Sequence, residues 1–327
     1  MLILNEGQIK EMYGMKDAIQ DVEATLISKF NDKVHAPLRT VLEFPEKEAT
    51  AIYMPSAEVQ SNVASVKVVT IFPQNPEIGL PTTQGIIVLT GVENGKHLAV
   101  MNASYLTRLR TGAISALATS KLSKEHSKVL TIIGTGAMAF EQTLGILAVR
   151  EIETMLLFNR TTEKAHQFKE KLIDHGVKAN IKVVGDVNSA VSMADIVCCA
   201  TKSTTPVFDG DYLKPGTHVI GVGSYLPTMC EIDRTTILRA SKIVVDDLEG
   251  VTEEAGELIE ANHSGEWTFD NIHGELELLV NNKIAAREND EEITFFKSVG
   301  ASYYDLAVAK GVYLKALENN IGILVDL

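Results

Sequence analysis

The chain has 327 residues, with 43 acidic and 30 basic side chains and a formal net charge of −13. This length is enough for two domains, each with its own core. The negative charge argues against a nucleic-acid-binding protein, because such a protein must neutralise phosphates. No segment approaches about 18 uncharged apolar residues, and the N-terminus lacks a basic segment followed by a long apolar core, so we expect neither a membrane span nor a signal peptide.

The chain contains three cysteines, Cys198, Cys199 and Cys230. Their spacing fits neither a metal site nor a disulfide framework. We therefore expect no bound metal, and a reducing, cytoplasmic location is the default. Cys198 and Cys199 lie inside an apolar strand pattern and are expected to be buried thiols.

The first third of the chain predicts one helix followed by a sheet. Residues 15–30 place Ala18, Val22, Leu26 and Phe30 at helical spacing. The strands expected after them are separated by proline, asparagine and glycine turns, which is typical of an antiparallel sheet: 38–44, 51–54, 63–72, 85–91 and 97–101. Asn102 then predicts the N-cap of a helix over 103–122.

A glycine motif follows a short apolar strand. Residues 129–133 are largely apolar, and Gly134-Thr135-Gly136-Ala137-Met138-Ala139 fits the G-x-G-x-x-A pattern. A helix and a second apolar strand, 155–158, complete the unit. The glycines of such a turn let backbone N–H groups approach a pyrophosphate at the helix N-terminus. The pattern predicts a dinucleotide site; the alternative is a glycine turn that holds no ligand.

The end of the second strand bears on the choice of cofactor. An NAD site usually has an acid here that bonds the ribose 2′-hydroxyl. This strand ends in Asn159-Arg160-Thr161, and Lys164 follows one turn later. A guanidinium beside a hydroxyl suits a 2′-phosphate, so NADP(H) is favoured and NAD(H) stays possible. The alternative is that Thr161 or Thr162 only caps the next helix and Arg160 is solvated.

Strands and helices alternate from residue 129 onwards. Beyond 161 we expect helices at 162–175, 187–193, 233–239, 251–261 and 274–281, and strands at 181–184, 195–201, 218–223, 242–246 and 293–299. This alternation predicts parallel βαβ units in a doubly wound, Rossmann-type α/β domain. A final helix over 303–319 is expected to return to the first domain. The predicted domains are residues 1–122 with 301–327, an α+β substrate and dimerisation domain, and residues 123–300, the dinucleotide-binding domain.

Arg39, Lys67 and Arg110 are the candidate catalytic cations of the first domain. A dehydrogenase acting on a carboxylate substrate needs an arginine fork to hold it and an acid or base near the carbon that accepts hydride. A lysine near other cations and apolar surface has a lowered pKa and can do this work. On the pattern alone, each could equally be a solvated charge at a strand edge.

Taken together, the chain resembles the ornithine cyclodeaminase/mu-crystallin family over nearly its whole length. The motifs that carry the resemblance are PLRT at 37–40, SVKVV at 65–69, TRLRTGAISALAT at 107–119, IIGTGAMA at 132–139, NRT at 159–161, ADIVCCAT at 194–201 and FFKSVGASYYDLA at 295–307. The resemblance implies a homodimer formed through the first domain, with substrate bound in a cleft between the domains. It also implies that Arg39, Lys67 and Arg110 bind the substrate carboxylate and carry the catalysis.

The resemblance also implies cofactor contacts. Thr111 is expected at the phosphates, and Val222 and the segment 297–300 at the nicotinamide end. With the residues above, the predicted cofactor-binding set is Thr111, Gly134, Gly136, Ala137, Met138, Asn159, Arg160, Thr161, Lys164, Thr201, Val222, Ser298 and Gly300. The predicted substrate set is Arg39, Lys67, Arg110 and Ser224.

Ser224 marks a departure from the family pattern. The cyclodeaminase pattern has an aspartate just after the glycines of the fifth strand, and in this sequence that place is assigned to Ser224 in Gly221-Val222-Gly223-Ser224. A serine cannot act as a carboxylate base near neutral pH. We therefore expect an NADPH-dependent reductase of a cyclic imino acid, Δ1-pyrroline-2-carboxylate or Δ1-piperideine-2-carboxylate. The alternatives are an ornithine cyclodeaminase, an amino-acid dehydrogenase or amino-acid-condensing enzyme, and an NADPH-binding protein without turnover.

Overall fold

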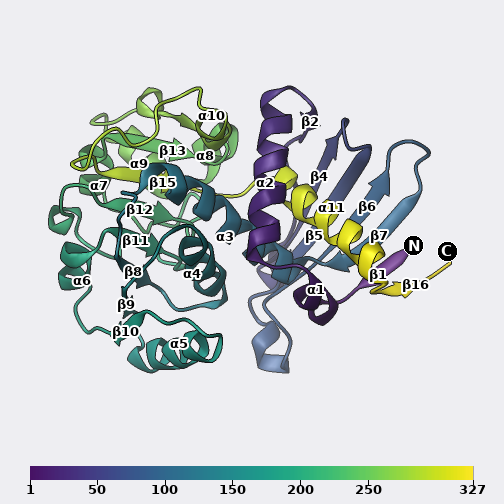
Figure 1. Cartoon of the computed structure of the whole chain (residues 1–327), viewed down its shortest axis with the longest axis horizontal. Helices are drawn as coiled ribbons and strands as arrows, with labels where there is room; N and C mark the ends of the chain where they lie inside the picture. The colour runs from purple at the N-terminus through teal and green to yellow at the C-terminus, as the bar shows by residue number, and fades with distance from the viewer. Residues whose placement is uncertain (327) are drawn as a thin grey trace. The chain divides into compact units, whose positions relative to one another are not determined.

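The computed structural model describes residues 1–326, which divide into two compact units (Figure 1). Unit 1 comprises residues 1–110 and the C-terminal segment from Ala301, and unit 2 comprises Thr111–Gly300. The second predicted boundary, after residue 300, coincides with this division. The first was placed after residue 122, whereas the units divide within helix α3 (Ala103–Leu122). Because one continuous helix crosses the division, the hydrophobic pattern contains no break there.

Unit 1 is built on an eight-stranded sheet in the order β16-β1-β7-β6-β5-β4-β2 (Figure 1), with β3 paired to β4. Its strands are β1 (Leu2–Leu4), β2 (Val34–His35), β3 (Thr40–Phe44), β4 (Ala49–Glu58), β5 (Val63–Ile71), β6 (Thr83–Gly91), β7 (His97–Asn102) and β16 (Ile323–Leu324). The pairings among β3 to β7 are antiparallel, as predicted. The two terminal strands, β1 and β16, were not predicted, since each is too short to show an alternating pattern.

The helices that lie wholly within the described part of unit 1 are α1 (Glu6–Met12), α2 (Met15–Phe30) and α11 (Ser302–Asn319). The helix predicted over 15–30 is thus found with the same bounds. Helix α11 packs against α2 and against β4, β5 and β6, so the end of the chain completes the first unit (Figure 1). Short 3-10 turns lie at η1 (Pro45–Lys47) and η2 (Asn75–Ile78).

The start of α3 follows from its cap. Asn102 Oδ1 accepts hydrogen bonds from the backbone N–H groups of Ser104 (3.0 Å) and Tyr105 (3.3 Å), which have no partner inside the helix. The predicted N-cap is therefore confirmed. It directs the helix that carries Arg110 away from the end of β7.

Unit 2 has an eight-stranded parallel sheet in the order β10-β9-β8-β11-β12-β15-β13-β14. Its strands are β8 (Val129–Ile133), β9 (Thr154–Phe158), β10 (Asn180–Val183), β11 (Ile196–Cys199), β12 (His218–Gly221), β13 (Lys242–Val245), β14 (Gly274–Glu275) and β15 (Thr294–Lys297). The predicted doubly wound α/β domain is confirmed. The residues of β11, β12, β13 and β15 are all buried, which explains why these strands are mostly apolar.

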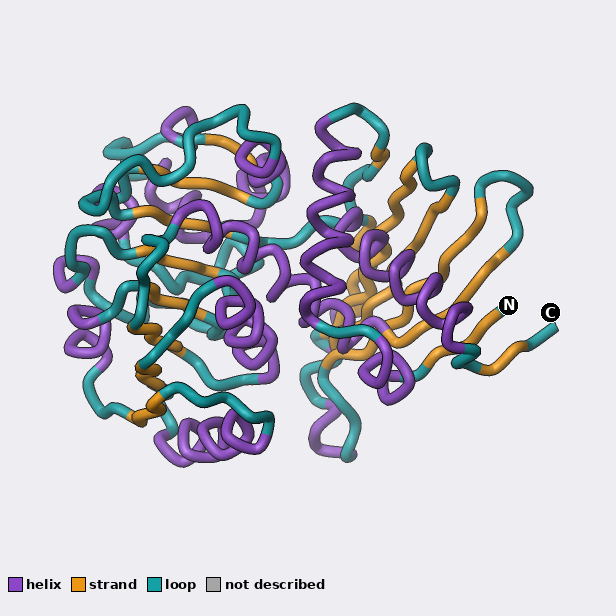
Figure 2. Tube along the Cα trace, viewed as in Figure 1, coloured by secondary structure: helices purple, strands orange, loops and turns teal. Residues whose placement is uncertain are grey.

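Helices of unit 2 follow its strands and flank the sheet (Figure 2). They are α4 (Ala137–Val149), α5 (Thr162–Asp174), α6 (Val187–Met193), α7 (Arg234–Arg239), α8 (Leu248–Glu254), α9 (Gly256–His263) and α10 (Leu276–Val280), with 3-10 turns η3 (Gly210–Tyr212) and η4 (Phe269–Asn271). The prediction of a single helix over 251–261 is wrong, because the helix is interrupted at Ala255, which separates α8 from α9. The helix predicted from 274 begins only at Leu276, since Gly274 and Glu275 form the edge strand β14.

No helix within residues 1–326 combines the length and the apolar character needed to cross a membrane. The same residues contain no grouping of His, Cys, Asp or Glu that could hold a metal ion.

Candidate active site

A pocket of about 660 Å³ opens in unit 2 at the carboxyl ends of β8, β9, β11 and β12. The chain proceeds from β8 to β9 and β10 on one side, and then to β11 and β12 on the other. Such a reversal point is where doubly wound sheets bind ligands. The lining residues are Ile133, Gly134, Thr135, Gly136, Ala137, Met138, Phe158, Asn159, Arg160, Thr161, Lys164, Ala200, Thr201, Lys202, Ser203, Val207, Val222, Gly223 and Tyr225.

The glycine turn has the geometry that a diphosphate requires. Gly134 has φ +89, and a Cβ there would lie 2.8 Å from the carbonyl oxygen of Ala200, so only glycine fits. Gly136 is the N-cap of α4 and supplies no capping side chain, and a Cβ there would point into open space. The first N–H groups of α4 are therefore available, and its first turn holds no acidic residue. These features fit the diphosphate of a nicotinamide dinucleotide.

The tip of β9 borders the same pocket. Asn159 is held by its neighbours: its Oδ1 accepts from the N–H of Thr135 at 3.3 Å, and its Nδ2 donates to the carbonyl of Thr161 at 2.9 Å. Arg160, Thr161 and Lys164 are exposed at the rim. Among the described lining residues there are cations but no acidic side chain. Thr161 occupies the N-cap position of α5, but its side chain makes no capping hydrogen bond. Helix capping therefore does not explain why a threonine stands at this position.

Several predicted cofactor residues lie elsewhere. Thr111 is buried in α3, and neither it nor Ser298 nor Gly300 lines the pocket. Ser298 Oγ and the N–H of Gly300 both donate to Asp246 Oδ2, at 2.6 and 2.7 Å. The lining residues that were not predicted as cofactor contacts are Ile133, Thr135, Phe158, Ala200, Lys202, Ser203, Val207, Gly223 and Tyr225. A signal for them was available, because they lie at or beyond the ends of predicted parallel strands, at the edge where the glycine turn lies.

The predicted substrate residue Ser224 is fully buried. Its hydroxyl donates to the carboxylate of Glu257 at 2.7–2.8 Å and accepts from Lys297 Nζ at 2.5 Å. It does not line the pocket, whereas its neighbours Gly223 and Tyr225 do. The hydroxyl of Ser224 is thus engaged inside the protein, and we do not retain its assignment to the substrate.

In unit 1, two of the three predicted cations meet on one carboxylate. Lys67 Nζ lies 2.5 Å from Asp305 Oδ2, and Arg110 Nε lies 3.3 Å from Asp305 Oδ1. The exposed fractions are 3% for Lys67, 5% for Arg110 and 0% for Asp305. Three elements supply the group: the central strand β5, helix α3 and the first turn of α11. The alternative of solvated edge charges is therefore wrong for Lys67 and Arg110.

The electrostatics of this cluster favour proton transfer near neutral pH. Burial lowers the pKa of Lys67 to about 8; the Asp305 carboxylate opposes this effect, and the charges of Arg110 and Arg39 add to it. Arg39 is half-buried just before β3 and acts on Lys67 through its charge. Arg110 Nη1 is buried without a hydrogen-bond partner among the described residues. A buried guanidinium N–H without a partner costs free energy unless a ligand such as a carboxylate completes it.

Asp305 was not predicted as a functional residue, although it lies in a motif used for the family resemblance. A signal existed, since it is the only acid in the otherwise hydrophobic stretch 303–309. An isolated carboxylate on a buried helix face requires a cationic partner. Nothing in the sequence showed which cation that was.

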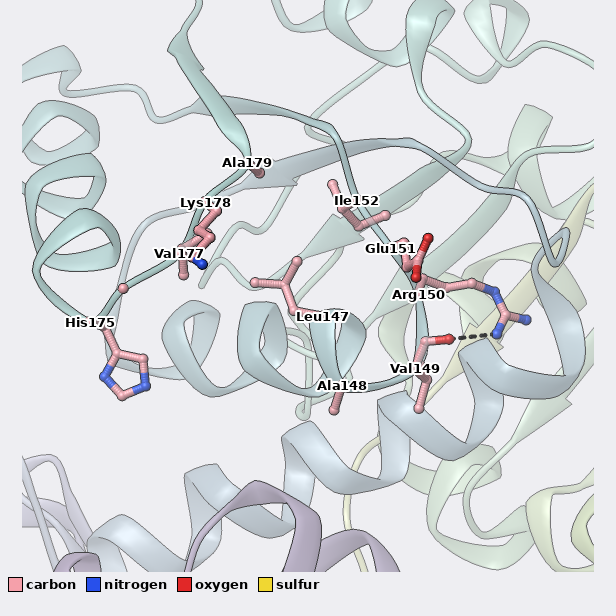
Figure 3. A pocket seen from close by; sticks show the side chains of 11 residues that line it. Leu147, Ala148, Val149, Arg150, Glu151, Ile152, His175, Val177, Lys178 and Ala179 are labelled. Atoms are coloured by element: carbon pink, nitrogen blue, oxygen red, sulfur yellow. Dashed lines mark hydrogen bonds between the residues drawn. The ribbon is translucent and has the colours of Figure 1, made fainter.

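A second hollow in unit 2 is formed by residues 147–152 and 175–179 (Figure 3). The guanidinium of Arg150, which borders this hollow, is engaged in hydrogen bonds within the protein. The guanidinium donates to the carbonyls of Val149 (2.8 Å), Thr119 (3.1 Å), Ser120 (2.9 Å) and Lys124 (3.0 Å). The guanidinium thereby satisfies carbonyls in the last turn of α3, so the presence of Arg150 beside this hollow is explained by its structural role.

Comparisons with known proteins bear on both the pocket and the cluster. The chain is 39% identical to a Δ1-pyrroline-2-carboxylate reductase of Bacillus cereus, over 98% of each chain. The structure of the Thermococcus litoralis Δ1-pyrroline-2-carboxylate reductase, in complex with NADH and L-proline, matches with a TM-score of 0.95 and 36% identity and covers 99% of this chain and 100% of that one. An archaeal alanine dehydrogenase dimer with bound NAD matches with a TM-score of 0.93 and 32% identity, covering 100% and 99%.

The model of one protein family matches residues 1–320, which is nearly the whole chain and includes the glycine turn, Lys67, Arg110 and Asp305. The chain belongs to the ornithine cyclodeaminase/mu-crystallin family.

Proposed function

We propose that this protein reduces a cyclic imino acid, Δ1-pyrroline-2-carboxylate or Δ1-piperideine-2-carboxylate, to L-proline or L-pipecolate with a reduced nicotinamide cofactor. The observation that carries the proposal is the buried Lys67–Asp305–Arg110 cluster, which pairs a lysine of lowered pKa with an arginine N–H that has no partner among the described residues. The relatives support it, since the most similar ones described above are reductases of such an imino acid.

The substrate has a carboxylate next to a C=N bond. Arg110, through its unpartnered Nη1, and Arg39 bind the carboxylate and orient the ring. When bound, the reduced nicotinamide supplies a hydride, two electrons with one proton, to the C=N carbon. Lys67 delivers the second proton to the imine nitrogen, directly or through a water molecule, and leaves a neutral amine behind. Its pKa of about 8 keeps it mostly protonated at neutral pH while making the proton easier to transfer.

The proposal is tested by following cofactor oxidation, through the near-ultraviolet absorbance of reduced nicotinamide, against a panel of cyclic imino acids. Lys67→Ala should abolish turnover and leave NADPH binding, measured by fluorescence, nearly unchanged. The matched control is Lys96→Ala, which removes an exposed lysine of the same unit. Retention of most activity by Lys67→Ala would show that the catalytic assignment is wrong.

We further propose that NADP(H) is preferred over NAD(H), with Arg160, Thr161 and Lys164 at the 2′-phosphate. The support is the cationic rim of the pocket and the lack of an acid among its described lining residues. Two relatives hold NADH or NAD in their structures, so the preference is a specific property proposed for this chain. Comparison of kcat/KM for NADPH and NADH tests it directly.

A homodimer formed through unit 1 is proposed as well. On β5 and β6 the buried Lys67 and Ile87 alternate with Val66, Val68 and Val88, which are only half-buried. The face on which these valines lie is therefore apolar and incompletely covered, which suits a second copy of the chain. The solved alanine dehydrogenase relative is a dimer. Sedimentation should give the mass of a dimer, and a monomer at micromolar concentration would contradict this. The free, buried cysteines are consistent with the cytoplasmic location that we also propose.

An amino-acid dehydrogenase is the second candidate, because an archaeal alanine dehydrogenase is among the similar structures. It would consume reduced cofactor with an oxo acid and ammonia rather than with a cyclic imine. Ornithine belongs in the same panel: a cyclodeaminase would release ammonia from it without a net change in the cofactor. Only oxidation of the reduced cofactor that depends on a cyclic imine identifies the proposed reductase.

A further inference from the structure

A second group of buried charges lies in unit 2, apart from Lys67. It consists of Glu231, Glu257, Lys297 and Ser224, whose exposed fractions are 0%, 2%, 0% and 0%. Lys297 Nζ contacts Glu257 Oε1 at 2.8 Å and the backbone and side-chain oxygens of Ser224 at 2.6 and 2.5 Å. We call these four residues the inner cluster. Buried charges of this kind are costly unless each one has partners.

Glu231 differs from the other members because its bonds go to the pocket wall. Its carboxylate accepts hydrogen bonds from the backbone N–H groups of Thr201 (2.5 Å), Gly223 (2.6 Å) and Ser224 (3.2 Å). Thr201 and Gly223 line the cofactor pocket. The carboxylate therefore lies directly behind the backbone of residues that line the pocket. It also ties together the segments that follow β11 and β12.

The charges of the inner cluster do not balance. It contains two carboxylates and one ammonium, and the ammonium makes its ion pair with Glu257. Burial raises the pKa of Glu231 above its ordinary value, whereas the Lys297 ammonium and the N–H of Thr201 favour the charged form. The field of Glu231 is also felt at Cys198 and Cys199, where burial first and then this carboxylate raise the pKa of each thiol. Because its carboxylate accepts hydrogen bonds from three backbone N–H groups and lies in the field of the Lys297 ammonium, we treat Glu231 as ionised.

The position of Glu231 along the pocket indicates a function for the excess negative charge of the inner cluster. In a doubly wound sheet the adenosine lies at the second strand of the nucleotide unit, here β9, and the other half of the cofactor extends across the reversal point towards β11 and β12. The wall held by Glu231 is then the nicotinamide end. The nicotinamide ring is neutral when reduced and carries a positive charge when oxidised.

We propose that the Glu231 carboxylate acts through this wall as a fixed counter-charge for the oxidised nicotinamide ring, so that it stabilises the bound oxidised cofactor relative to the reduced one. This inference rests on the proposed function. Charge that develops on the ring as the hydride leaves meets a carboxylate already oriented by three backbone N–H groups, so no reorganisation is needed. A cationic group at the same place would oppose hydride donation, and a neutral group would not assist it.

The test compares Glu231→Gln with the wild type by measuring the dissociation constants for NADP⁺ and NADPH in fluorescence titrations. We expect the ratio of the NADP⁺ constant to the NADPH constant to rise on the order of tenfold, since a unit charge acts strongly across a water-excluded wall. A mere defect in packing would weaken both forms alike and leave the ratio unchanged. The matched control is Glu260→Gln, which removes an exposed carboxylate from helix α9.

An unchanged ratio in a folded Glu231→Gln variant would overturn the inference while leaving the proposed function intact. If that variant does not fold, Glu257→Gln removes one negative charge from the same cluster and should move the ratio in the same direction. Failure of both variants to fold would mean that the cluster serves the fold alone and would reject the electrostatic role. A wild type that binds neither nucleotide would instead contradict the proposed function itself.

Discussion

Replacement of Asp305 by asparagine is the sharpest perturbation of the Lys67 cluster. The two side chains have nearly the same shape, so the change removes a charge and little volume. Asp305 is the only described carboxylate that is ion-paired with both Lys67 and Arg110. Its charge is also the main influence that raises the pKa of Lys67 against the effect of burial. Asp305→Asn should therefore lower the pKa of Lys67 below about 8.

The size of the effect follows from the geometry. An opposite charge in direct contact shifts a pKa by roughly 1–3 pH units. If Lys67 must be protonated to donate, wild-type kcat/KM falls as the pH rises through about 8. A displacement of about 2 pH units in the variant would leave about one-tenth of Lys67 protonated at neutral pH, and activity there should fall on the order of tenfold.

The assay is kcat/KM for imine reduction across the pH range, for the wild type, Asp305→Asn and the control Glu318→Gln, an exposed carboxylate of the same helix. In the variant the alkaline limb should move to lower pH, and activity should recover as the pH falls. A profile that is lower at every pH, with its alkaline limb unmoved, would refute the reasoning, since that pattern describes a misplaced lysine and not a changed pKa. Thermal unfolding runs in parallel, because two buried cations without their partner cost about 3–5 kcal/mol.

Three further predictions concern unit 2. Arg160→Asp should shift the preference from NADPH towards NADH by on the order of tenfold or more in kcat/KM, and an unchanged ratio would remove the 2′-phosphate argument. Burial raises the pKa of Asp195, but the N–H groups of Lys128 and Val129 and the Lys214 ammonium outweigh it and lower the pKa to about 2. The stabilising contribution of the Asp195 carboxylate is therefore present above the ordinary carboxylate pKa and is lost as the pH falls towards 2. Asp195→Asn should reduce the free energy of unfolding at neutral pH, measured by denaturant titration, by about 2 kcal/mol. Gly145→Ala should cost about 1–3 kcal/mol in the same measurement, because its Cβ would lie 2.2 Å from the carbonyl oxygen of Gly112, while Gly185→Ala, with open space around the new Cβ, should cost much less.

The sequence alone determined the doubly wound domain and most of its cofactor pocket. Gly134, Gly136, Asn159, Arg160 and Thr161 all follow the ends of neighbouring parallel strands, so their proximity is a consequence of strand order. Each signal is local: an apolar run, a glycine turn, the residue at a strand tip. Such short-range patterns state which face of an element is buried and where the element ends.

Only the tertiary structure decided which buried faces meet. Asp305 lies 238 residues from Lys67 and 195 from Arg110, and no periodicity within β5, α3 or α11 indicates that these side chains share one ion-pair cluster. The segment that begins at Lys297 was predicted near the nicotinamide, yet the Lys297 side chain turns into the core towards Glu257. Pairing between distant elements depends on how whole helices and sheets pack, and that information is spread over the entire chain rather than held by the residues that finally touch.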